Sequence, residues 1–462
     1  MQFNSLEFIV FLPIVFAIYW SLNNRRHQNV LVLAASYLFY GWWEWRFLLL
    51  IAITTACSFS SGLLIQRFCS VRKWICGVNV VLNLAILAVF KYFDFFADNL
   101  HALATVLGWH IDAPTLNIVL PVGISFYTFQ ALSYTIDVYR GRISPTREVV
   151  DFFAYISFFP QLVAGPIERA TELLPQFQRP RHFDQDRAID GVWQMLWGAF
   201  KKMVIADNCA PLVDAVWAHP HEMGSGWLAM GVLLFAFQIY GDFSGYSDMA
   251  IGCARLFGID LTRNFNYPYF ARTIPDFWRR WHISLTTWFR DYVYIPLGGN
   301  RCAKPMVVRN VLLVWLLSGL WHGANWTFVC WGLYHAALLL FYRALKLRGN
   351  WLLTFVLVLI GWVIFRAPSI AQAVDYLAVM VRVGHLPLWQ GMDIGRLGVV
   401  ALAIVMMLMA EYRAQDRQHA LQCCTTTVSR HMLWGRLALM AVVAQVILMF
   451  AGTQSQFIYF QF

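Results

Sequence analysis

The sequence predicts an all-α protein that crosses a membrane many times. Three observations support this fold class: 59% of the 462 residues are hydrophobic, only 13% are charged, and the apolar residues form long runs between short basic clusters. Soluble domains carry about 25% charged residues, and a chain this apolar could not cover its surface with polar groups. The spans are expected to be helices, because lipid offers the backbone no hydrogen-bond partners and the alternating pattern of a barrel is absent.

The apolar runs define the candidate spans of a single integral membrane domain, residues 1–462. A spanning helix needs about 20 mainly apolar residues. Because some runs are shorter and others longer, we expect about nine to twelve spans. The candidate runs are 6–22, 28–41, 47–65, 75–98, 117–138, 188–208, 226–257, 310–342, 350–366, 397–411 and 434–452.

Lysine and arginine set the expected orientation, because cytoplasmic connections are enriched in both. This rule puts the N-terminus on the periplasmic side, together with the connections 41–45, 97–113 and 367–395. It also accounts for the net charge of +10 without a nucleic-acid partner. The basic segments placed in the cytoplasm are 25–26, 66–73, 139–147, 272–309, 343–348 and 413–436.

Two regions do not have the pattern of simple spans. Residues 152–166 form a short apolar run broken by Pro160, Gly165 and Pro166, which suits a re-entrant or buried segment. Residues 274–300 mix aromatic and basic residues, which predicts amphipathic helices along the cytoplasmic interface.

The strongest single feature is His322, within a stretch from Asn310 to Tyr342 that has no charged residue. A continuous helix of that length would measure about 50 Å, against a hydrocarbon core of about 30 Å. The stretch must therefore tilt, bend or divide, and Gly319 and Gly323 mark the expected place. An ionisable residue at membrane depth indicates function, although a neutral histidine that only helps helices to pack is the alternative. The polar residues expected around it are Ser318, Asn325 and Thr327, whereas His335 is expected nearer the interface.

A second candidate is His282, in the run FWRRWHISL. Arg279 and Arg280 could hold an anionic group, and Trp278 and Trp281 could line an adenine or pantetheine path. An interfacial aromatic belt with snorkelling arginines explains the same residues equally well.

Polar residues also interrupt the run 226–257. Carboxylates are costly there, so we expect Asp242 and Asp248 to pair with basic residues and their neighbours to line a cavity; a proton or ion path is the alternative. The polar residues in question are Gln238, Tyr240, Asp242, Ser244, Tyr246 and Asp248. No metal-ligand spacing, GxSxG, HExxH or Gly-rich phosphate loop occurs, so neither a metal nor a bound cofactor is expected.

These motifs resemble those of the membrane-bound O-acyltransferases (MBOAT), in particular the bacterial branch that O-acetylates alginate. The stretches RRWHISL and GLWHGANW carry the most specific part of the resemblance, which extends over nearly the whole chain. The matching stretches are SYLFYGWW, KYFDFF, LPVGISFYTFQALSYTIDVYRG, FFPQLVAGPIER, QIYGDFSGYSDMAIG, NFNYPYFARTIPDFWRRWHISLTTWFRDYVYIPLGGNR, GLWHGANWTFVCWGLYH and the terminal FIYFQF.

The resemblance implies a ring of helices around a thin centre, with His322 as the essential histidine and His282 at the second family position. It implies O-acetylation of alginate, another exopolysaccharide, cellulose or peptidoglycan in the bacterial inner membrane, with a periplasmic partner of the SGNH-hydrolase type. The donor is expected to be acetyl-CoA or an acyl carrier protein thioester, reaching His322 past Arg279, Arg280 and His282.

In that scheme His322 is the general base, and Asn325, the Trp321 indole or backbone N–H groups stabilise the oxyanion. His282 orients the donor or protonates the leaving sulfur. The accepting hydroxyl could belong to the polysaccharide itself or to a serine of the periplasmic partner, and a covalent intermediate on this chain is also open. The alternative functions are D-alanyl-type transfer as in teichoic acid modification, a flippase for an acyl carrier or polysaccharide precursor, and a scaffold that recruits the true transferase.

Overall fold

The computed structural model describes residues 1–109, 119–345, 347–382, 393–422, 430–452 and 455–458, and every regular element in these ranges is a helix. They form two compact units, one of Met1–Asp184 with Phe257–Leu261 and the other of Gln185–Leu256 with Thr262–Phe462. The predicted all-α class is therefore confirmed. Of the terminal FIYFQF, residues 459–462 lie outside the described ranges.

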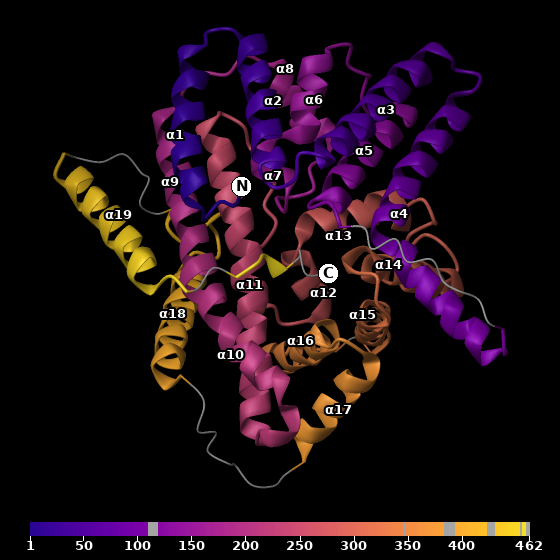
Figure 1. Ribbon diagram of the computed structural model, residues 1–462, viewed down its shortest axis with the longest axis vertical. Helices are drawn as coiled ribbons and strands as arrows, with labels where there is room; N and C mark the ends of the chain where they lie inside the picture. Colours follow the sequence, from indigo (N-terminus) through magenta and orange to yellow (C-terminus); the bar gives the residue numbers. More distant parts are fainter. Residues whose placement is uncertain (110–118, 346, 383–392, 423–429, 453–454, 459–462) are drawn as a thin grey trace. The chain divides into compact units, whose positions relative to one another are not determined.

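The first unit contains eight of the helices shown in Figure 1. Polar side chains cap the first turns of the first two helices. Ser5 and Asn24 each accept a hydrogen bond from a backbone N–H two or three residues later. The eight are α1 (Leu6–Ser21), α2 (Arg25–Gly41), α3 (Phe47–Arg67), α4 (Arg72–Val106), α5 (Ile124–Tyr139), α6 (Val149–Ser157), α7 (Phe159–Leu162) and α8 (Ala170–Gln178).

The broken segment of residues 152–166 is buried almost throughout, as the sequence indicated, and divides into α6 and α7. Polar side chains bind the backbone groups that the break exposes. The Phe159 N–H donates to Ser36 Oγ at 3.0 Å, and the Gln130 and Gln161 side-chain amides both donate to the Tyr155 carbonyl. Irregular backbone is thus kept inside protein, where its hydrogen bonds are satisfied.

The second unit contains the remaining helices and every candidate site residue. In it α9 and α11 lie side by side (Figure 1), because a Cβ on Gly198 or Gly252 would strike the backbone of the other helix. Its elements are α9 (Gln185–Ala199), the π-helix η1 (Phe200–Ala206), α10 (Asp207–Ala218), η2 (Pro220–Glu222), α11 (Ser225–Leu256), η3 (Pro268–Phe270), α12 (Ile274–Arg280), α13 (Ile283–Phe289), the π-helix η4 (Arg290–Tyr294), α14 (Lys304–His322), α15 (Trp326–Leu345), α16 (Trp351–Arg366), α17 (Ile370–Val381), α18 (Ile394–Arg413) and α19 (Arg430–Phe450).

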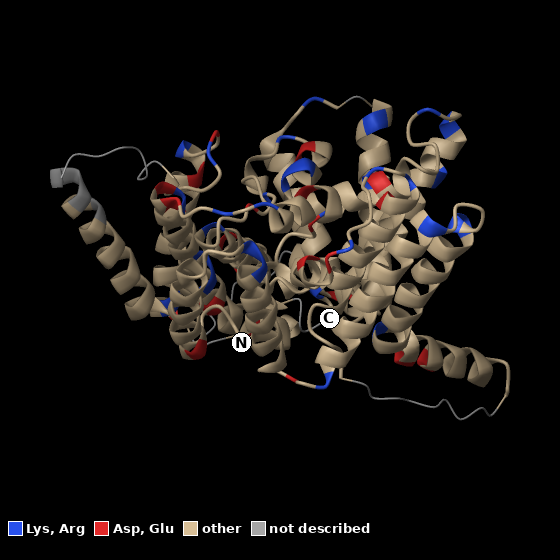
Figure 2. Ribbon diagram, turned by 90° about the horizontal axis from the view of Figure 1, so that it is seen from above, with Lys and Arg blue, Asp and Glu red and all other residues tan. Residues whose placement is uncertain are grey.

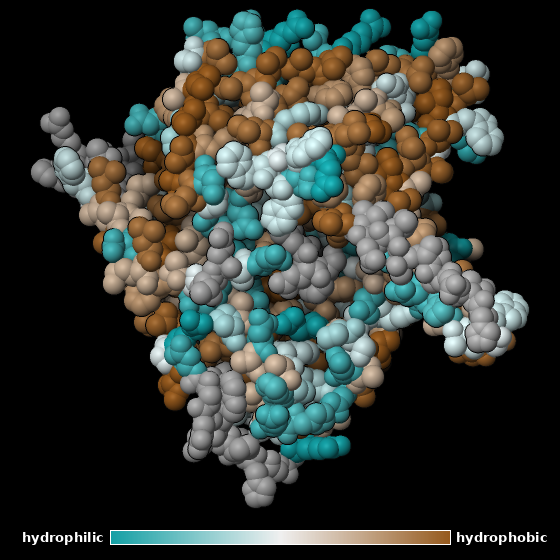
Figure 3. Space-filling view, viewed as in Figure 1, coloured by the Kyte–Doolittle hydropathy of each residue, from teal (hydrophilic) through white to brown (hydrophobic). Residues whose placement is uncertain are grey.

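Six described helices are long and apolar enough to cross a membrane, and four shorter apolar helices accompany them. The six are α3, α4, α11, α14, α15 and α18, and the shorter ones are α1, α16, α17 and Leu437–Phe450. Charged residues gather in short stretches between long uncharged ones (Figure 2), and hydrophobic side chains cover the visible faces of α1 and α3 (Figure 3). The chain is a multi-pass membrane protein.

Two predicted connections contain helix. Residues 367–395 were expected to be a connection, but Ile370–Val381 form α17, which the Ser369 side chain caps by accepting from the Gln372 N–H. With 12 residues, α17 is too short to be recognised as a span. In the second case, α4 continues to Val106, into the predicted connection 97–113.

Candidate active site

The long uncharged stretch divides beside His322, as its length required. His322 is the last residue of α14, Gly323 is extended, and α15 begins at Trp326. Glycines let the two helices pack against each other, because a Cβ on Gly319 would meet the Phe328 carbonyl and one on Gly332 the Trp315 carbonyl. The break leaves His322 buried at a helix end, with 4% of its surface exposed.

His282 lies in the turn between α12 and α13 and is held in an unusual backbone conformation. Its φ of 45° is in the left-handed region, which non-glycine residues rarely adopt. Two backbone hydrogen bonds of 2.9 Å fix the turn: the Ile283 N–H donates to the Asn264 carbonyl, and the Asn266 N–H donates to the Arg280 carbonyl. Such conformations concentrate at functional sites, where the surrounding structure maintains them.

The Asn264 side chain determines which nitrogen of His282 carries the proton. Asn264 Oδ1 accepts from the Ser284 backbone N–H at 3.3 Å and from Ser284 Oγ at 2.9 Å. A backbone N–H can only donate, so the atom facing it is the amide oxygen. His282 Nδ1 lies 3.1 Å from the same oxygen and must therefore donate to it. The acceptor nitrogen of the neutral ring is then Nε2.

Burial keeps that imidazole neutral. His282 lies outside the spanning helices, yet only 1% of its surface is exposed, and burial lowers its pKa to about 3. Desolvation disfavours the charged form of a histidine. At neutral pH the ring therefore cannot supply a proton as an imidazolium ion.

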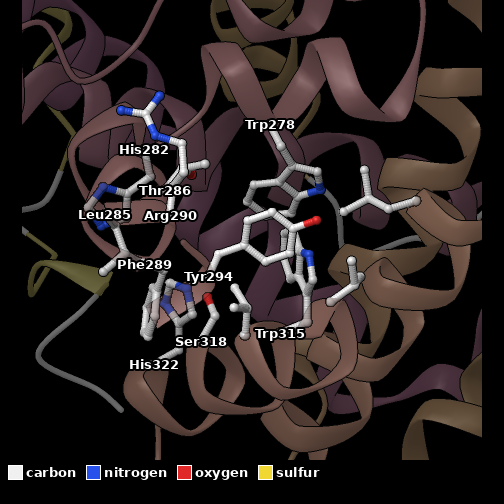
Figure 4. A pocket seen from close by; sticks show the side chains of 13 residues that line it. Trp278, His282, Leu285, Thr286, Phe289, Arg290, Tyr294, Trp315, Ser318 and His322 are labelled. Carbon is white, nitrogen blue, oxygen red and sulfur yellow. The ribbon is translucent and has the colours of Figure 1, made fainter. Parts of the chain in front are cut away.

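The two histidines line one cavity of about 220 Å³, and their ring centroids are 6.4 Å apart. Figure 4 shows both histidines on one side of it with Ser318, whereas Trp278 and Trp315 lie on the other side. The lining residues are Trp278, His282, Leu285, Thr286, Phe289, Arg290, Tyr294, Val311, Val314, Trp315, Ser318, His322 and Leu339. The cavity thus combines two imidazoles and three hydroxyls with a largely apolar wall.

Of the predicted site residues, His282, His322, Trp278 and Ser318 meet at this cavity. Trp321 lies behind it, with ring centroids 5.7 Å from His282 and 5.1 Å from His322. Trp281 packs in the interior against Trp362, 4.9 Å away. The tryptophan-rich character of the sequence therefore reflects the packing around the histidines as well as membrane interfaces.

Other predicted residues lie elsewhere. The Asn325 side chain is engaged at the start of α15, since its amide donates to the Pro368 carbonyl and its oxygen accepts from the Thr327 N–H. Arg279 is exposed, and Arg280 forms a 3.1 Å ion pair with Asp276 one helical turn earlier. The arginine at the cavity is instead Arg290, whose guanidinium contacts Asp291.

Asp242 and Asp248 are paired with lysines of η1, as their cost in lipid predicted. The Lys202 ammonium lies 2.7 Å from Asp242 and 2.8 Å from Asp207, and Lys201 lies 2.5 Å from Asp248. Gln238 and Tyr246, which were expected to line a cavity, lie outside the lining of this one, and Tyr246 packs against Phe457 with ring centroids 5.2 Å apart. These observations support the structural interpretation of the carboxylates rather than an ion path. Within the described ranges, no group of three His, Cys, Asp or Glu side chains is placed to hold a metal ion.

Besides Arg290 and other lining residues such as Tyr294, three contributors to the site were missed in the sequence. Asn264 sets the tautomer of His282, Trp315 forms cavity wall, and His335, expected near the interface, is buried with 1% exposure beside Trp278. The motif NFNYPYF contains Asn264, and WHGANWTFVCWGLYH contains His335, so their presence in the matched stretches was the available signal.

Comparison with known proteins gives a consistent result. Residues 37–348 match the family model of the membrane-bound O-acyltransferases. A probable alginate O-acetylase from Azotobacter vinelandii is 42% identical over 424 residues, covering 89% of this chain and 83% of that protein. A peptidoglycan O-acetyltransferase from Helicobacter pylori is 33% identical, covering 100% of this chain and 97% of that protein.

A teichoic acid D-alanyltransferase from Bacillus subtilis is 29% identical over half of this chain. The family model covers well over half of the sequence, and the acetylating relatives match along most of it. The chain therefore belongs to the membrane-bound O-acyltransferase family and is an O-acyltransferase.

Proposed function

We propose that this chain transfers an acetyl group from a cytoplasmic thioester to an acceptor hydroxyl on the extracytoplasmic side, for O-acetylation of a polysaccharide, with His322 as general base. The observation that carries the proposal is the cavity shared by His322 and His282, placed where a membrane-crossing helix is broken. Acetyl-CoA or an acyl carrier protein thioester is the donor. The chain lies in the bacterial inner membrane with its N-terminus in the periplasm, in agreement with the basic clusters of the sequence.

The chemistry begins when His322 takes the proton of the acceptor hydroxyl. The acceptor oxygen forms a bond to the thioester carbonyl carbon, and the carbonyl oxygen becomes negatively charged. When the intermediate collapses, the C–S bond breaks, and the leaving thiolate recovers the proton held by His322. The products are an acetyl ester and a free thiol, so atoms and charge balance.

The hydroxyl of Ser318, rather than the amide of Asn325, is assigned as the hydrogen-bond donor to the oxyanion. The Asn325 amide already donates to Pro368, whereas Ser318 lines the cavity four residues before His322 on the same helix. Residues four apart on a helix share one face. A hydroxyl donor at that position can stabilise developing charge in a low-dielectric site.

His282 orients the donor and does not protonate the sulfur. Its Nδ1–H is committed to Asn264, and burial keeps the ring neutral at physiological pH. The remaining nitrogen, Nε2, is an acceptor in that tautomer. It is suited to accept from an N–H or O–H of a bound substrate, which fixes the thioester relative to His322.

Alginate is the first polymer to test as the final acceptor. Relatives named as alginate O-acetylases share 38–42% identity with this chain, against 29% for the teichoic acid D-alanyltransferases, which match half of it or less. Acetyl is therefore favoured over D-alanyl. A periplasmic SGNH-type protein is the proposed intermediary between this chain and the polymer.

Replacement of His322 tests the proposal directly. We expect His322→Asn to lower transfer of labelled acetyl from acetyl-CoA by about 10²–10⁴-fold, the usual contribution of a general base. The assay uses membrane vesicles that contain the chain, its periplasmic partner and alginate. His221→Asn is the matched control, because His221 is exposed and pairs only with the surface residue Asp375.

Transfer by His322→Asn at the wild-type rate, with equal amounts of folded protein, would refute the role of His322. The purified wild-type chain separates the remaining alternatives. Release of thiol from acetyl-CoA by that chain identifies it as the transferase, whereas no acyl transfer at all would indicate a scaffold. A flippase has no supporting observation here, since the buried carboxylates are held by lysines.

A further inference from the structure

His335 is a buried histidine that the proposed mechanism does not use. It lies on α15, 13 residues after His322, with 1% of its surface exposed. Its ring is surrounded by aromatic side chains, with centroids 4.8 Å from Trp278, 5.0 Å from Trp331, 5.6 Å from Trp315 and 5.2 Å from Tyr334. It is not among the residues that line the cavity.

One hydrogen bond connects His335 to the cavity wall. The Trp278 indole Nε1–H donates to His335 Nδ1 at 3.3 Å. An indole nitrogen can only donate, so His335 must accept and carries its own proton on Nε2. The bond fixes the rotation of the Trp278 side chain and turns its N–H away from the cavity. The ring carbons of Trp278 therefore face the space that His322 also borders.

The opposite face of His335 is confined as well. A Cβ added to Gly361 on α16 would approach His335 Nε2 to 2.8 Å, which is closer than ordinary contact. Gly361 thus provides the room that the imidazole occupies, and α16 prevents it from retreating from Trp278. The ring is held between a glycine on one side and the indole on the other.

The wall that results is the apolar end of the cavity. Trp278 and Trp315 lie with ring centroids 4.5 Å apart, on the side opposite His282 and His322 (Figure 4). The cavity of about 220 Å³ has to hold the thioester end of the donor as well as the acyl group. The position of the tryptophan pair therefore determines how much acyl chain fits beyond the thioester carbon.

We infer that His335 is a positioning residue that holds Trp278 across the end of the cavity and thereby restricts the transferred acyl group to a short one. The inference rests on the proposed function, because it assigns the acyl group to the cavity beside His322. It adds a determinant of acyl length that neither histidine of the mechanism supplies.

The test compares two donors in variants that remain active. Membrane vesicles with the full chain receive labelled acetyl-CoA or butanoyl-CoA, and the ratio of the two transfer rates is measured. We expect His335→Leu, which removes the acceptor, to raise the butanoyl-to-acetyl ratio about tenfold, the lower end of what a methylene contributes in a pocket. His335→Asn places an acceptor near the position of Nδ1 and should restore the wild-type ratio.

Two further variants separate positioning from general loss of structure. Gly361→Ala crowds His335 from the side away from the cavity and should also change the ratio. Tyr334→Phe removes a 2.8 Å hydrogen bond from the neighbouring residue to the Leu357 carbonyl and should leave the ratio unchanged.

If His335→Leu lowered both rates equally, or if His335→Asn failed to restore the ratio, the positioning role would be refuted. The proposed function would survive that result, because it depends on the activity of the His322→Asn variant. Conversely, full activity of His322→Asn would remove the proposed function whatever the ratio in the His335 variants.

Discussion

Two buried polar regions of the second unit show opposite ways of placing ionisable groups inside a membrane protein. In the lysine cluster, Lys201 and Lys202 of η1 contact Asp207, Asp242 and Asp248 at 2.5–2.8 Å. At the histidine cavity, His282 and His322 border about 220 Å³ of space with apolar walls. One region consists of charges in direct contact, and the other is a largely apolar space for substrate that the two histidines border.

In the proposed function, this difference is the reason for assigning the chemistry to the histidine cavity. A buried charge without a partner is very costly. The carboxylates of α11 are held by their lysines, and they also accept hydrogen bonds from Gln194 and from the Ile458 N–H, so they are not available to a substrate. A neutral imidazole costs far less to bury and can still accept a proton. Buried polar groups therefore indicate an active site in this chain only where they also face a cavity.

A substitution in the lysine cluster should lower the stability of the folded protein, and this is the largest effect that we expect. Lys202→Met leaves Asp207 and Asp242 buried without their shared ammonium group. We expect the free energy of unfolding to fall by about 3–5 kcal/mol, measured as a lower midpoint of thermal unfolding in detergent. Arg46→Gln is the control, because the Arg46–Glu44 pair is largely exposed. An unchanged midpoint in Lys202→Met would contradict a structural role for the cluster.

A substitution at the histidine cavity should lower the rate of transfer instead, and a change at Asn264 tests this through its dependence on pH. In Asn264→Asp, a carboxylate replaces the amide oxygen that faces His282 Nδ1. A nearby negative charge raises the pKa of a histidine, here from about 3. Below the new pKa the ring becomes charged and Nε2 can no longer accept. The ratio of variant to wild-type transfer rates should therefore fall as pH decreases from 8 to 5.

The same pKa predicts the direction of the stability change with pH in the wild-type chain. The folded-state pKa of His282, about 3, lies below the unfolded value of about 6.5. Between these two pKa values the unfolded protein binds a proton that the folded protein does not. The contribution of His282 to the free energy of unfolding is therefore fully present above pH 6.5 and is lost as pH falls towards 3. A rate ratio independent of pH in Asn264→Asp would show that His282 is not held as the geometry indicates.

The junction of α14 and α15 supports the cavity, and its glycines should tolerate no side chain. A Cβ on Gly332 would meet the Trp315 carbonyl, so Gly332→Ala must move one helix. We expect a loss of about 1–3 kcal/mol in stability, as for other overpacked cores. Gly398→Ala is the matched control, since nothing lies within 4 Å of that position in α18 and alanine favours helix. Equal thermal midpoints for the two variants would contradict this account.

The sequence predicted the features that depend on length and polarity. The stretch around His322 had to divide because it was too long for the bilayer, and Asp242 had to find a cation because lipid solvates charge poorly. It did not predict Asn264 beside His282, because that contact depends on a left-handed turn and on backbone bonds between distant segments. Composition also could not distinguish Arg290 from Arg279 and Arg280, since only the fold determines which arginine faces the cavity.

The smallest expected effect concerns the KM for acetyl-CoA, and it comes from replacing Arg280 or Arg290. Arg280 pairs with Asp276 and does not line the cavity, so Arg280→Gln should leave the KM for acetyl-CoA nearly unchanged. Arg290→Gln removes the arginine at the cavity and should raise the KM several-fold more, with kcat little changed. Because salt screens exposed charges, the difference between the two variants should shrink in 1 M salt. A larger effect from Arg280→Gln would place the donor path along α12 instead of η4.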